Sequence, residues 1–424
     1  MPTFQTVRGM RDLLGQEAQI VTSIIAKAQE TASLFRFKEV FTPHVEYLEL
    51  LSAKTGDEIR QRMFIFEDLG KRQVALRPEF TASIARLVTT TLRTEPKPLK
   101  LFSAGTVYRY DEPQRGRYRE FWQSNFELIG VDKPEADTEI ILLTNKLLQS
   151  IGLSDFAFKI GHIGIIKGIL SQDGIDEKTQ NTILQRMDKK EYSLALKLVD
   201  SEKCQNTLQS LISINGKDWR DVVEQINVLV VGYEKAKAAV ENLVEVLTLV
   251  TASTEISLTV EPAFARGLEY YTGMIFEVYI PQLEIALGGG GRYDRLIEAF
   301  GGEPTSAVGC AHGIDRTAIA IQTQNATYLT KAKVSVVVIP ITESVKVDAL
   351  KIAQSIREHG VSAEFELMGR KMGKALEAAD KHGFDYAIIV GERELCEGNV
   401  VVKDLKKHEQ STVLIEELFE KIKK

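Results

Sequence analysis

Residues 107–127 read Val-Tyr-Arg-Tyr-Asp-Glu-Pro-Gln-Arg-Gly-Arg-Tyr-Arg-Glu-Phe-Trp-Gln-Ser-Asn-Phe-Glu and predict a β-hairpin with a long polar loop. Side chains two residues apart share one face of a strand, so we expect Gln123, Asn125 and Glu127 on the same face. If the strands pair symmetrically about the loop, Arg109 shares a cavity with that face. Two interpretations stay open here: a site for a phosphate and an amine, or surface charges on an edge hairpin.

The composition places the hairpin in an ordinary globular protein. The chain has 424 residues, of which 44% are hydrophobic and 26% charged, and this length suggests two to four domains. No run approaches the roughly 18 apolar residues that a membrane helix requires, and the N-terminus lacks the pattern of a secretory signal. The three cysteines lie too far apart for a disulfide framework or a CxxC metal site, and we expect them to be buried small residues. These features predict a cytosolic protein.

The charge of the chain is unevenly distributed. The 53 basic and 59 acidic residues give a net charge of −6, which argues against uniform binding of nucleic acid. Residues 86–119, however, contain eight basic and three acidic residues, a local charge of +5. The basic charge is therefore concentrated around the hairpin.

Around the hairpin, the apolar pattern predicts an α+β domain. Short apolar runs over 102–110, 121–129, 274–280 and 306–310 read as strands, and their succession favours a largely antiparallel sheet flanked by helices. Residues 171–252 instead carry apolar side chains at helical spacing and predict a helical insertion.

The C-terminal part of the chain predicts a separate α/β domain over residues 331–424, preceded by a polar linker over 322–333. The domain before it spans residues 1–325. The expected strands of the C-terminal domain are 334–339, 363–366, 387–390 and 400–402, and its expected helices are 344–358, 370–382 and 412–423.

Several common catalytic motifs are missing from the sequence. No GxxxxGK[ST] is present, which excludes a P-loop enzyme, and 288–291 is a poor dinucleotide fingerprint. No HExxH or similar spacing occurs among the six histidines, so we expect no protein-bound metal. Most of the histidines are expected to be surface or capping residues.

Four further stretches combine an arginine with a carboxylate, and three of them also contain glycines. The glycine run 288–291 would let backbone approach a ligand closely, although it could equally be a flexible hairpin tip. Arg316 opens a predicted helix, where a cation is unfavourable unless an anion binds at the same place. The stretches are Leu-Arg-Pro-Glu-Phe-Thr at 76–81, Ala-Arg-Gly-Leu-Glu-Tyr-Tyr-Thr-Gly at 265–273, Leu-Gly-Gly-Gly-Gly-Arg-Tyr-Asp at 287–294 and Val-Gly-Cys-Ala-His-Gly-Ile-Asp-Arg at 308–316.

Together these motifs resemble the class II aminoacyl-tRNA synthetases, and specifically the histidyl-tRNA synthetase family of class IIa. The hairpin 108–121 looks like motif 2 of that class, and 308–316 looks like motif 3. The stretches 266–271 and 289–294 look like the two histidine-specific signatures. The resemblance covers the whole chain, because 331–424 is similar to a class IIa anticodon-binding domain and 171–252 matches the place of the family's variable insertion.

The resemblance implies that the chain activates L-histidine with ATP, carrying Mg²⁺, and transfers the histidyl group to the 3′ end of tRNA(His). It also implies a homodimer with an N-terminal helix near 16–35 at the interface. The catalytic residues would be Arg266, which contacts both the histidine carboxylate and the α-phosphate, and Arg109, which holds the α-phosphate. An arginine fork suits both partners because it stays charged and donates two parallel hydrogen bonds.

The other implied contacts fall into three groups. For ATP they are Asp111, Arg117 and, at the γ-phosphate, Arg316. For the amino acid they are Glu79, Thr81 and Gln123 at the α-amino group, Glu127 and Tyr271 at the imidazole, and Phe80 and Tyr270 nearby. For the acceptor end of the tRNA they are Gln114 and Arg115.

Two other functions are consistent with parts of this pattern. One is a catalytically inactive, synthetase-like regulatory subunit of histidine biosynthesis, which would lack the anticodon-binding domain and the arginine signature. The other is a synthetase for a different amino acid of the same subclass. Some positions also depart from the family's usual residues, namely Phe80, Asp111, Glu269 and His312. His312 could line the pocket or be a packed strand residue.

Overall fold

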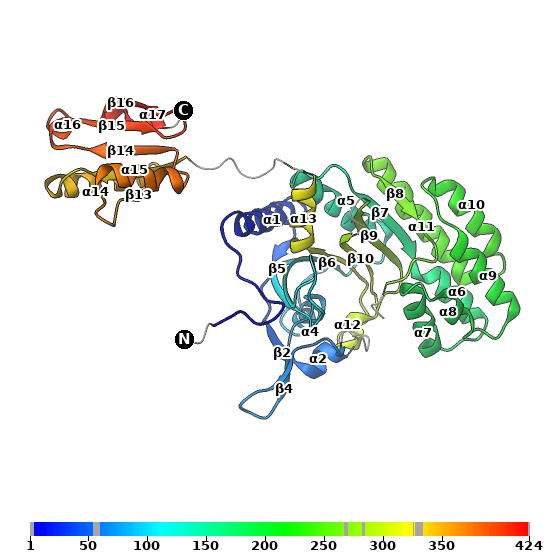
Figure 1. The fold of residues 1–424 in the computed structure, drawn as a ribbon. Helices are drawn as coiled ribbons and strands as arrows, with labels where there is room; N and C mark the ends of the chain where they lie inside the picture. The colour runs from blue at the N-terminus through cyan, green and yellow to red at the C-terminus, as the bar shows by residue number, and fades with distance from the viewer. Residues whose placement is uncertain are drawn as a thin grey trace. The chain divides into compact units, whose positions relative to one another are not determined.

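The chain folds into two compact units, Met1–Tyr328 and Leu329–Lys424, whose elements are drawn in Figure 1. The computed structural model describes residues 4–53, 60–266, 270–281, 285–324, 326 and 334–422. Residues 267–269 of one signature and most of the expected linker 322–333 lie outside the described residues. No helix in these described ranges is long and apolar enough to cross a membrane.

An eight-stranded sheet forms the centre of the first unit, in the order β1-β5-β6-β11-β10-β9-β7-β8. All pairs between β5 and β7 in this order are antiparallel, whereas the short edge strands β1 and β8 pair in parallel. The predicted largely antiparallel sheet is therefore confirmed. Its strands are β1 (Lys38–Glu39), β5 (Leu99–Tyr108), β6 (Glu120–Ile129), β7 (Ala157–His162), β8 (Leu258–Val260), β9 (Met274–Ile280), β10 (Ile285–Arg292) and β11 (Ala307–Gly313).

Strand alternation decides which side chains of the hairpin enter the core. On β6, Phe126 is fully buried and packs against the rings of Phe37 and Phe102. Its neighbours Asn125 and Glu127 point to the other face, as period 2 requires. The register Tyr108↔Glu120 closes the hairpin symmetrically about the loop.

Three helices, α1 (Gly15–Leu34), α5 (Pro134–Ser150) and α13 (Ile314–Thr323), pack together and against β5, β6 and β11 (Figure 1). The buried residues of α1 recur at helical spacing, which explains its amphipathic packing. Helix α5 begins with Pro134 at its first position and has Glu135 and Asp137 in its first turn, both typical of a helix N-terminus.

The segment 171–252 is helical, as its apolar spacing predicts. It follows α6 (Ile163–Gln172), and its longest helix packs on α6 and α5, so its apolar residues join the same hydrophobic core as the sheet. Its helices are α7 (Glu177–Asp188), α8 (Tyr192–Leu196), α9 (Glu202–Ser213), α10 (Trp219–Leu229) and α11 (Glu234–Ser253).

A smaller sheet, in the order β2-β4-β3, lies beside α4 (Thr81–Thr89). Helix α4 follows directly after the stretch 76–81, so this sheet and the helix together place Glu79 and Thr81. The neighbouring elements are β2 (Val45–Tyr47), α2 (Leu48–Ser52), β3 (Ile65–Glu67), β4 (Gln73–Leu76) and α12 (Leu296–Ala299).

The second unit has a five-stranded sheet in the order β13-β12-β14-β15-β16, with apolar cores on both faces. The pairs among β13, β12 and β14 are parallel and the remaining two are antiparallel. Its strands are β12 (Ser335–Pro340), β13 (Ser362–Phe365), β14 (Tyr386–Val390), β15 (Asn399–Asp404) and β16 (Glu409–Leu414). Its helical elements are η1 (Glu343–Val345), α14 (Lys346–Glu358), α15 (Met372–Lys381), α16 (Glu392–Cys396), η2 (Ile415–Glu417) and α17 (Leu418–Ile422).

The predicted helix over 412–423 is wrong in its first half. Strand β16 continues to Leu414, and the α-helix begins only at Leu418. The hairpin turn before β16 has no glycine; instead, His408 adopts a positive φ of 58° and the Asp404 carboxylate accepts from two backbone N–H groups. Because the turn lacks its usual residues, the sequence pattern did not indicate it.

Candidate active site

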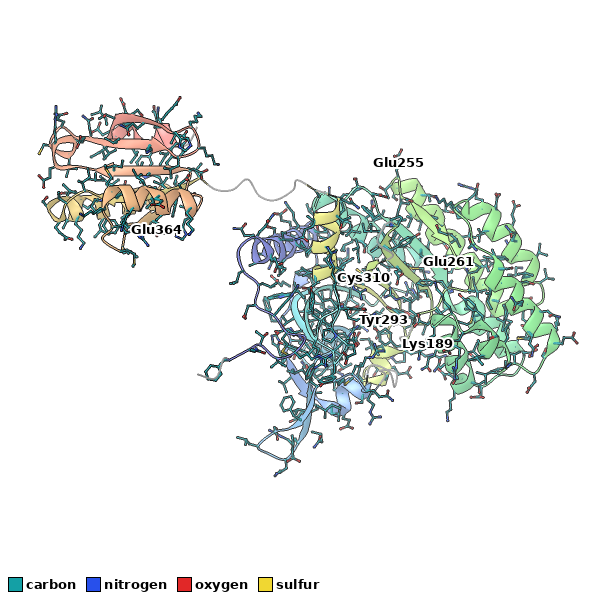
Figure 2. The ribbon with its side chains drawn as sticks, in the orientation of Figure 1. Lys189, Glu255, Glu261, Tyr293, Cys310 and Glu364 are labelled. Atoms are coloured by element: carbon teal, nitrogen blue, oxygen red, sulfur yellow. The ribbon has the colours of Figure 1, made fainter. Side chains whose placement is uncertain are left out.

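A cavity of about 380 Å³ lies over β6, β10 and β11 in the first unit. Figure 2 labels Tyr293 and Cys310, two residues of its lining, over the central sheet. The structure brings most of the sequence-predicted residues together in this cavity. They are Glu79, Thr81, Arg109, Asp111, Arg117, Gln123, Glu127, Arg266, Tyr270, Tyr271 and Arg316.

The glycine run 288–291 forms β10 and is not a hairpin tip. It pairs with β9 on one side and β11 on the other, and Gly288 and Gly289 line the cavity. A Cβ at Gly290 would overlap the carbonyl oxygen of Gly309 on the neighbouring strand. The run therefore permits close packing of three strands under the cavity.

Glu127 lines the cavity and accepts hydrogen bonds from three side chains, at what we call the carboxylate end. The hydroxyl of Thr81 and the amide of Asn125 both donate to its Oε1 atom at 2.7 Å. The Tyr293 hydroxyl donates to its Oε2 atom. Burial raises the pKa of Glu127 to about 7, although these three donors oppose the shift.

Close to Glu127, a second buried carboxylate faces the same cavity. Glu79 accepts a hydrogen bond of 3.2 Å from the hydroxyl of Tyr270. Burial raises the pKa of Glu79, and the nearby Arg109 guanidinium opposes the rise. Two carboxylates thus meet in one desolvated region, where a charged ammonium group would be stabilised.

Arginines from four segments converge on the rest of the cavity. Arg109 donates from Nε to the Pro78 carbonyl at 3.0 Å, and Arg316 donates to the carbonyls of Gly116 and Ala286. Burial lowers the pKa of Arg316, and its neighbours Arg117, Arg109 and Arg266 lower it further. Mutually repelling guanidinium groups in one cavity are the arrangement that a polyphosphate would stabilise.

Arg266 interacts electrostatically with Tyr271, which neighbours the two carboxylates, and with Arg316, so it lies near both the carboxylate end and the arginine end. Its Nη1 atom donates to the carbonyl of Phe276 at 3.1 Å and lies 3.8 Å from the carboxylate of Glu277. Asp111 is held at the rim by Arg62 at 3.3 Å and Arg117 at 3.8 Å.

Three predicted site residues lie elsewhere. Phe80 is 1% exposed and packs in the core beneath the Arg77 guanidinium, so the structure gives it a packing role in place of the expected contact with the amino acid. Gln114 and Arg115 are exposed at the tip of the hairpin loop and do not line the cavity.

Tyr293 and Glu277 are among the residues that line the cavity without having been predicted from the sequence. Tyr293 belongs to the signature 289–294, but no local pattern indicates its contact with Glu127. Glu277 interrupts the apolar strand β9 with a charged residue, and this was the signal that could have identified it.

The other histidine and cysteine predictions have mixed outcomes. His312 is 2% exposed, its Nε2 atom lies 3.1 Å from the Thr144 hydroxyl, and burial lowers its pKa to about 4. It is thus a packed strand residue. Cys204 and Cys310 are buried as expected, but Cys396 is exposed at the end of α16, so the prediction for it was wrong.

Comparison with known proteins agrees with this geometry. A sequence model of histidyl-tRNA synthetase matches residues 9–317, and one of an anticodon-binding domain matches residues 335–424. The histidine–tRNA ligase of Methanocaldococcus jannaschii is 39% identical over 420 residues, which are 98% of each chain.

Solved structures share the fold. A histidyl-tRNA synthetase from Nostoc sp. superimposes with a TM-score of 0.82 over 100% of this chain and 99% of that one, at 23% identity. A Bacillus halodurans protein described as an ATP phosphoribosyltransferase regulatory subunit/histidyl-tRNA synthetase has a TM-score of 0.78 at 27% identity, covering 92% of this chain and 99% of that one.

Proposed function

The chain belongs to the histidyl-tRNA synthetase family, and on that premise we propose that the cavity over β6, β10 and β11 is where histidine reacts with ATP. The activity is that of a histidine–tRNA ligase. The observation that carries the assignment is the division of one cavity into a buried carboxylate end at Glu127 and an arginine end at Arg316. An amino acid and a triphosphate bound in this way would meet between the two ends, beside Arg266.

The first step forms histidyl-adenylate. An oxygen of the histidine carboxylate attacks the α-phosphorus of ATP, the bond from that phosphorus to the α,β-bridging oxygen breaks, and pyrophosphate leaves. Two anions must approach each other, so alignment and charge neutralisation matter more than a base. Arg266 would contact the carboxylate and the α-phosphate together, and Arg109 would hold the α-phosphate from the hairpin.

The rest of the triphosphate is assigned to the opposite side of the cavity. Arg316 would bind the γ-phosphate, with Arg117 beside it and Asp111 nearer the nucleoside. Mg²⁺ belongs to the ATP substrate and would arrive on its phosphate oxygens.

The amino acid is assigned to the carboxylate end. Glu79, Gln123 and the oxygen of Thr81 would accept from the α-amino group, since the Thr81 proton is already donated to Glu127. Glu127 and Tyr271 would bind the imidazole, with Tyr270 holding Glu79 in place. A site that satisfies both ring nitrogens rejects isosteres without them, because its own buried polar groups would stay unpaired.

The second step transfers the histidyl group to the terminal ribose of tRNA(His). A ribose hydroxyl attacks the carbonyl carbon, the bond from that carbon to the phosphate oxygen breaks, and AMP leaves with the hydroxyl proton. We assign Gln114 and Arg115, exposed on the hairpin loop, to the acceptor end of the tRNA, and the domain over 331–424 to the anticodon. The homodimer and a cytosolic location remain part of this proposal.

The regulatory-subunit alternative has less support. Such a protein would dispense with the arginine signature and the anticodon-binding domain. Here Arg266 lines the cavity, and residues 335–424 match an anticodon-binding domain.

Amino-acid-dependent exchange of pyrophosphate into ATP tests the assignment. The purified chain should catalyse exchange with histidine and stay at background with proline or threonine. Equal exchange with proline or threonine would overturn the specificity.

A further inference from the structure

The histidine-specific signature at 289–294 contains a buried arginine, Arg292, that the proposed chemistry does not use. Arg292 ends β10, and its side chain is 7% exposed. Neither Arg292 nor its partner Asp137 lines the cavity. Burying an ion pair costs desolvation free energy, so the pair can add little to stability. Its contribution can instead lie in the residues that it holds in position.

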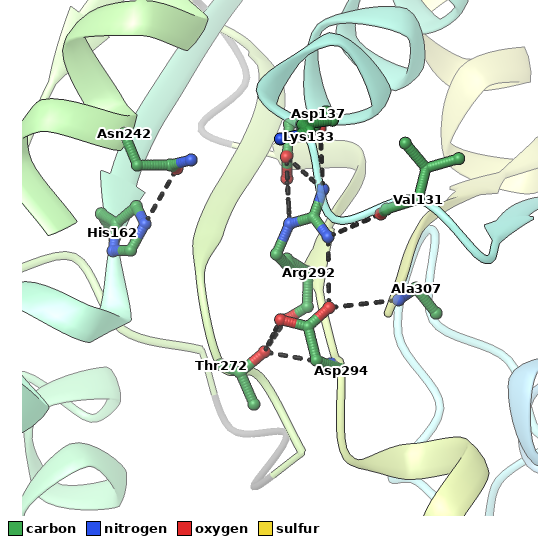
Figure 3. A network of polar contacts seen from close by, with 9 residues as sticks. All are labelled: Val131, Lys133, Asp137, His162, Asn242, Thr272, Arg292, Asp294 and Ala307. Atoms are coloured by element: carbon green, nitrogen blue, oxygen red, sulfur yellow. Dashed lines mark hydrogen bonds and ion pairs between the residues drawn. The ribbon is translucent and has the colours of Figure 1, made fainter. Parts of the chain in front are cut away.

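Figure 3 shows Arg292 bonded on two sides. On one side, Nε donates to both carboxylate oxygens of Asp137 at the start of α5, at 3.1 and 3.0 Å, and Nη2 adds a third hydrogen bond. On the other side, Nη1 donates to Asp294 at 3.1 Å and to the carbonyl of Val131 at 2.9 Å. Every nitrogen of the guanidinium is therefore engaged.

Tyr293 lies in the sequence between Arg292 and Asp294, which both belong to this network. Its backbone N–H donates to the Ala307 carbonyl at 2.7 Å, while the N–H of Ala307 donates to Asp294 at 3.1 Å. Thr272 closes the ring, because its N–H donates to the Arg292 carbonyl at 2.8 Å and its hydroxyl accepts from the Asp294 N–H at 3.0 Å. Hydrogen bonds made by Arg292 and Asp294, on either side of Tyr293, therefore fix its backbone.

The side chain of Tyr293 reaches from this fixed peptide to Glu127. The tyrosine is 3% exposed, its ring lies 5.7 Å from that of Tyr270, and its hydroxyl donates to Oε2 of Glu127. A carboxylate has about four acceptor positions. Thr81 and Asn125 take the two on Oε1 and Tyr293 takes one on Oε2, which leaves one acceptor position for an N–H donor in the cavity.

We infer that the Arg292–Asp137 ion pair is a positioning device that holds the Tyr293 hydroxyl on Glu127, so that a single acceptor position is presented to the histidine ring. The inference rests on the proposed function, because it supposes that the ring binds at Glu127. Arg292, Asp137 and Tyr293 are positioning residues, since they act on the substrate through Glu127.

Two variants test it in histidine-dependent pyrophosphate exchange. Tyr293→Phe removes only the hydroxyl, and Asp137→Asn removes the charge that holds Arg292. Both should raise the KM for histidine about tenfold and change the KM for ATP and kcat by less than about twofold, since one hydrogen bond to a charged group is lost from one end of the cavity.

The matched control is Glu46→Gln. It breaks the pair of Glu46 with Arg86, another arginine bonded through two nitrogens to a mostly buried carboxylate in the same unit. Glu46→Gln should lower the melting temperature and leave the KM for histidine unchanged. A lowered melting temperature in Asp137→Asn with a wild-type KM for histidine would overturn the inference.

The pH profile adds a readout that a purely structural role would not change. Tyr293→Phe removes a donor that favours the carboxylate, so the acidic limb of kcat/KM for histidine should move to higher pH. The other titratable groups around Glu127 are Glu79, Tyr270, Tyr271 and Cys310. These groups and Asp137 are unchanged in Tyr293→Phe.

An unshifted limb together with a wild-type KM in Tyr293→Phe would overturn the inference, even if Asp137→Asn does not fold. Failure of the proposed function looks different: the wild-type chain itself would then show no histidine-dependent exchange, and the inference would fall with it.

Discussion

The guanidinium of Arg266 occupies the space beside Gly289 into which any Cβ at that position would project. The carbonyl of Phe276, which accepts from Arg266, lies 2.6 Å from the same Cβ position. Arg266 can therefore occupy this position beside strand β10 because residue 289 has no side chain.

Gly289→Ala should therefore impair activation severely. The new methyl group displaces either Arg266 or the paired strand, and displacement of a group at the reacting centre by about 1 Å costs about a hundredfold in rate. The measurement is kcat/KM for histidine in pyrophosphate exchange. Gly373→Ala is the matched control, since Gly373 lies on α15 with no atom within 4 Å of its Cβ position, and it should keep wild-type activity. Equal activity of the two variants would contradict the assigned place of Arg266.

Arg266→Ala should depress adenylate formation by about a hundredfold or more, because it removes charge stabilisation where the phosphate reacts. Binding of tRNA should change little, since Arg266 lies inside the cavity. Single-turnover adenylate formation and tRNA binding measured on the same preparation separate the two effects. Arg266→Lys keeps the charge but loses the fork, and should fall between wild type and alanine. A near-wild-type rate in Arg266→Ala would remove its role.

Much of the site follows from local sequence rules. The alternation on β6 placed Gln123, Asn125 and Glu127 on one face, and the loop length brought Arg109 to the same cavity. Arg316 was marked by its unfavourable place at a helix N-terminus. These predictions needed only the period of a strand and the direction of a helix.

Other features of the structure could not be predicted from the local sequence, and the clearest of them is a contact between residues far apart in the chain. The hydroxyl of Tyr293 meets Glu127 from 166 residues away, and nothing in the pattern around either residue points to the other. Phe80 is adjacent to Glu79 but faces the core, because the start of α4 turns the two side chains apart. The β15–β16 hairpin was missed since His408 takes the positive φ that a glycine usually provides.

Glu127 should make the protein less stable as the pH rises from about 4.5 to about 7. Its pKa in the folded chain is raised from 4.5 to about 7, so between these values the folded state binds more protons than the unfolded state and stability falls as the pH rises. The shift corresponds to at most about 3 kcal/mol. Glu127→Gln should melt a few degrees above wild type at pH 8 and at the same temperature near pH 4, while losing histidine activation. Identical melting curves at pH 8 would contradict the buried, ionised carboxylate.

Removal of residues 331–424 should separate the two steps of the reaction. All the assigned residues for histidine and ATP lie in the first unit, so histidine-dependent pyrophosphate exchange should persist within about threefold. Charging of tRNA(His) should weaken through a higher KM for tRNA. Unchanged charging of the full-length tRNA by the shortened chain would contradict an anticodon-binding role for this domain.

We propose that one cavity holds the histidine ring at Glu127 and the phosphates at the arginines. A crystal structure with a non-hydrolysable histidyl-adenylate analogue, the histidyl sulfamate of adenosine, tests it most directly. We expect a ring nitrogen within hydrogen-bond distance of Glu127 Oε2 and the sulfamate between Arg266 and Arg109. An imidazole bound away from Glu127, or a sulfamate that touches neither arginine, would contradict it.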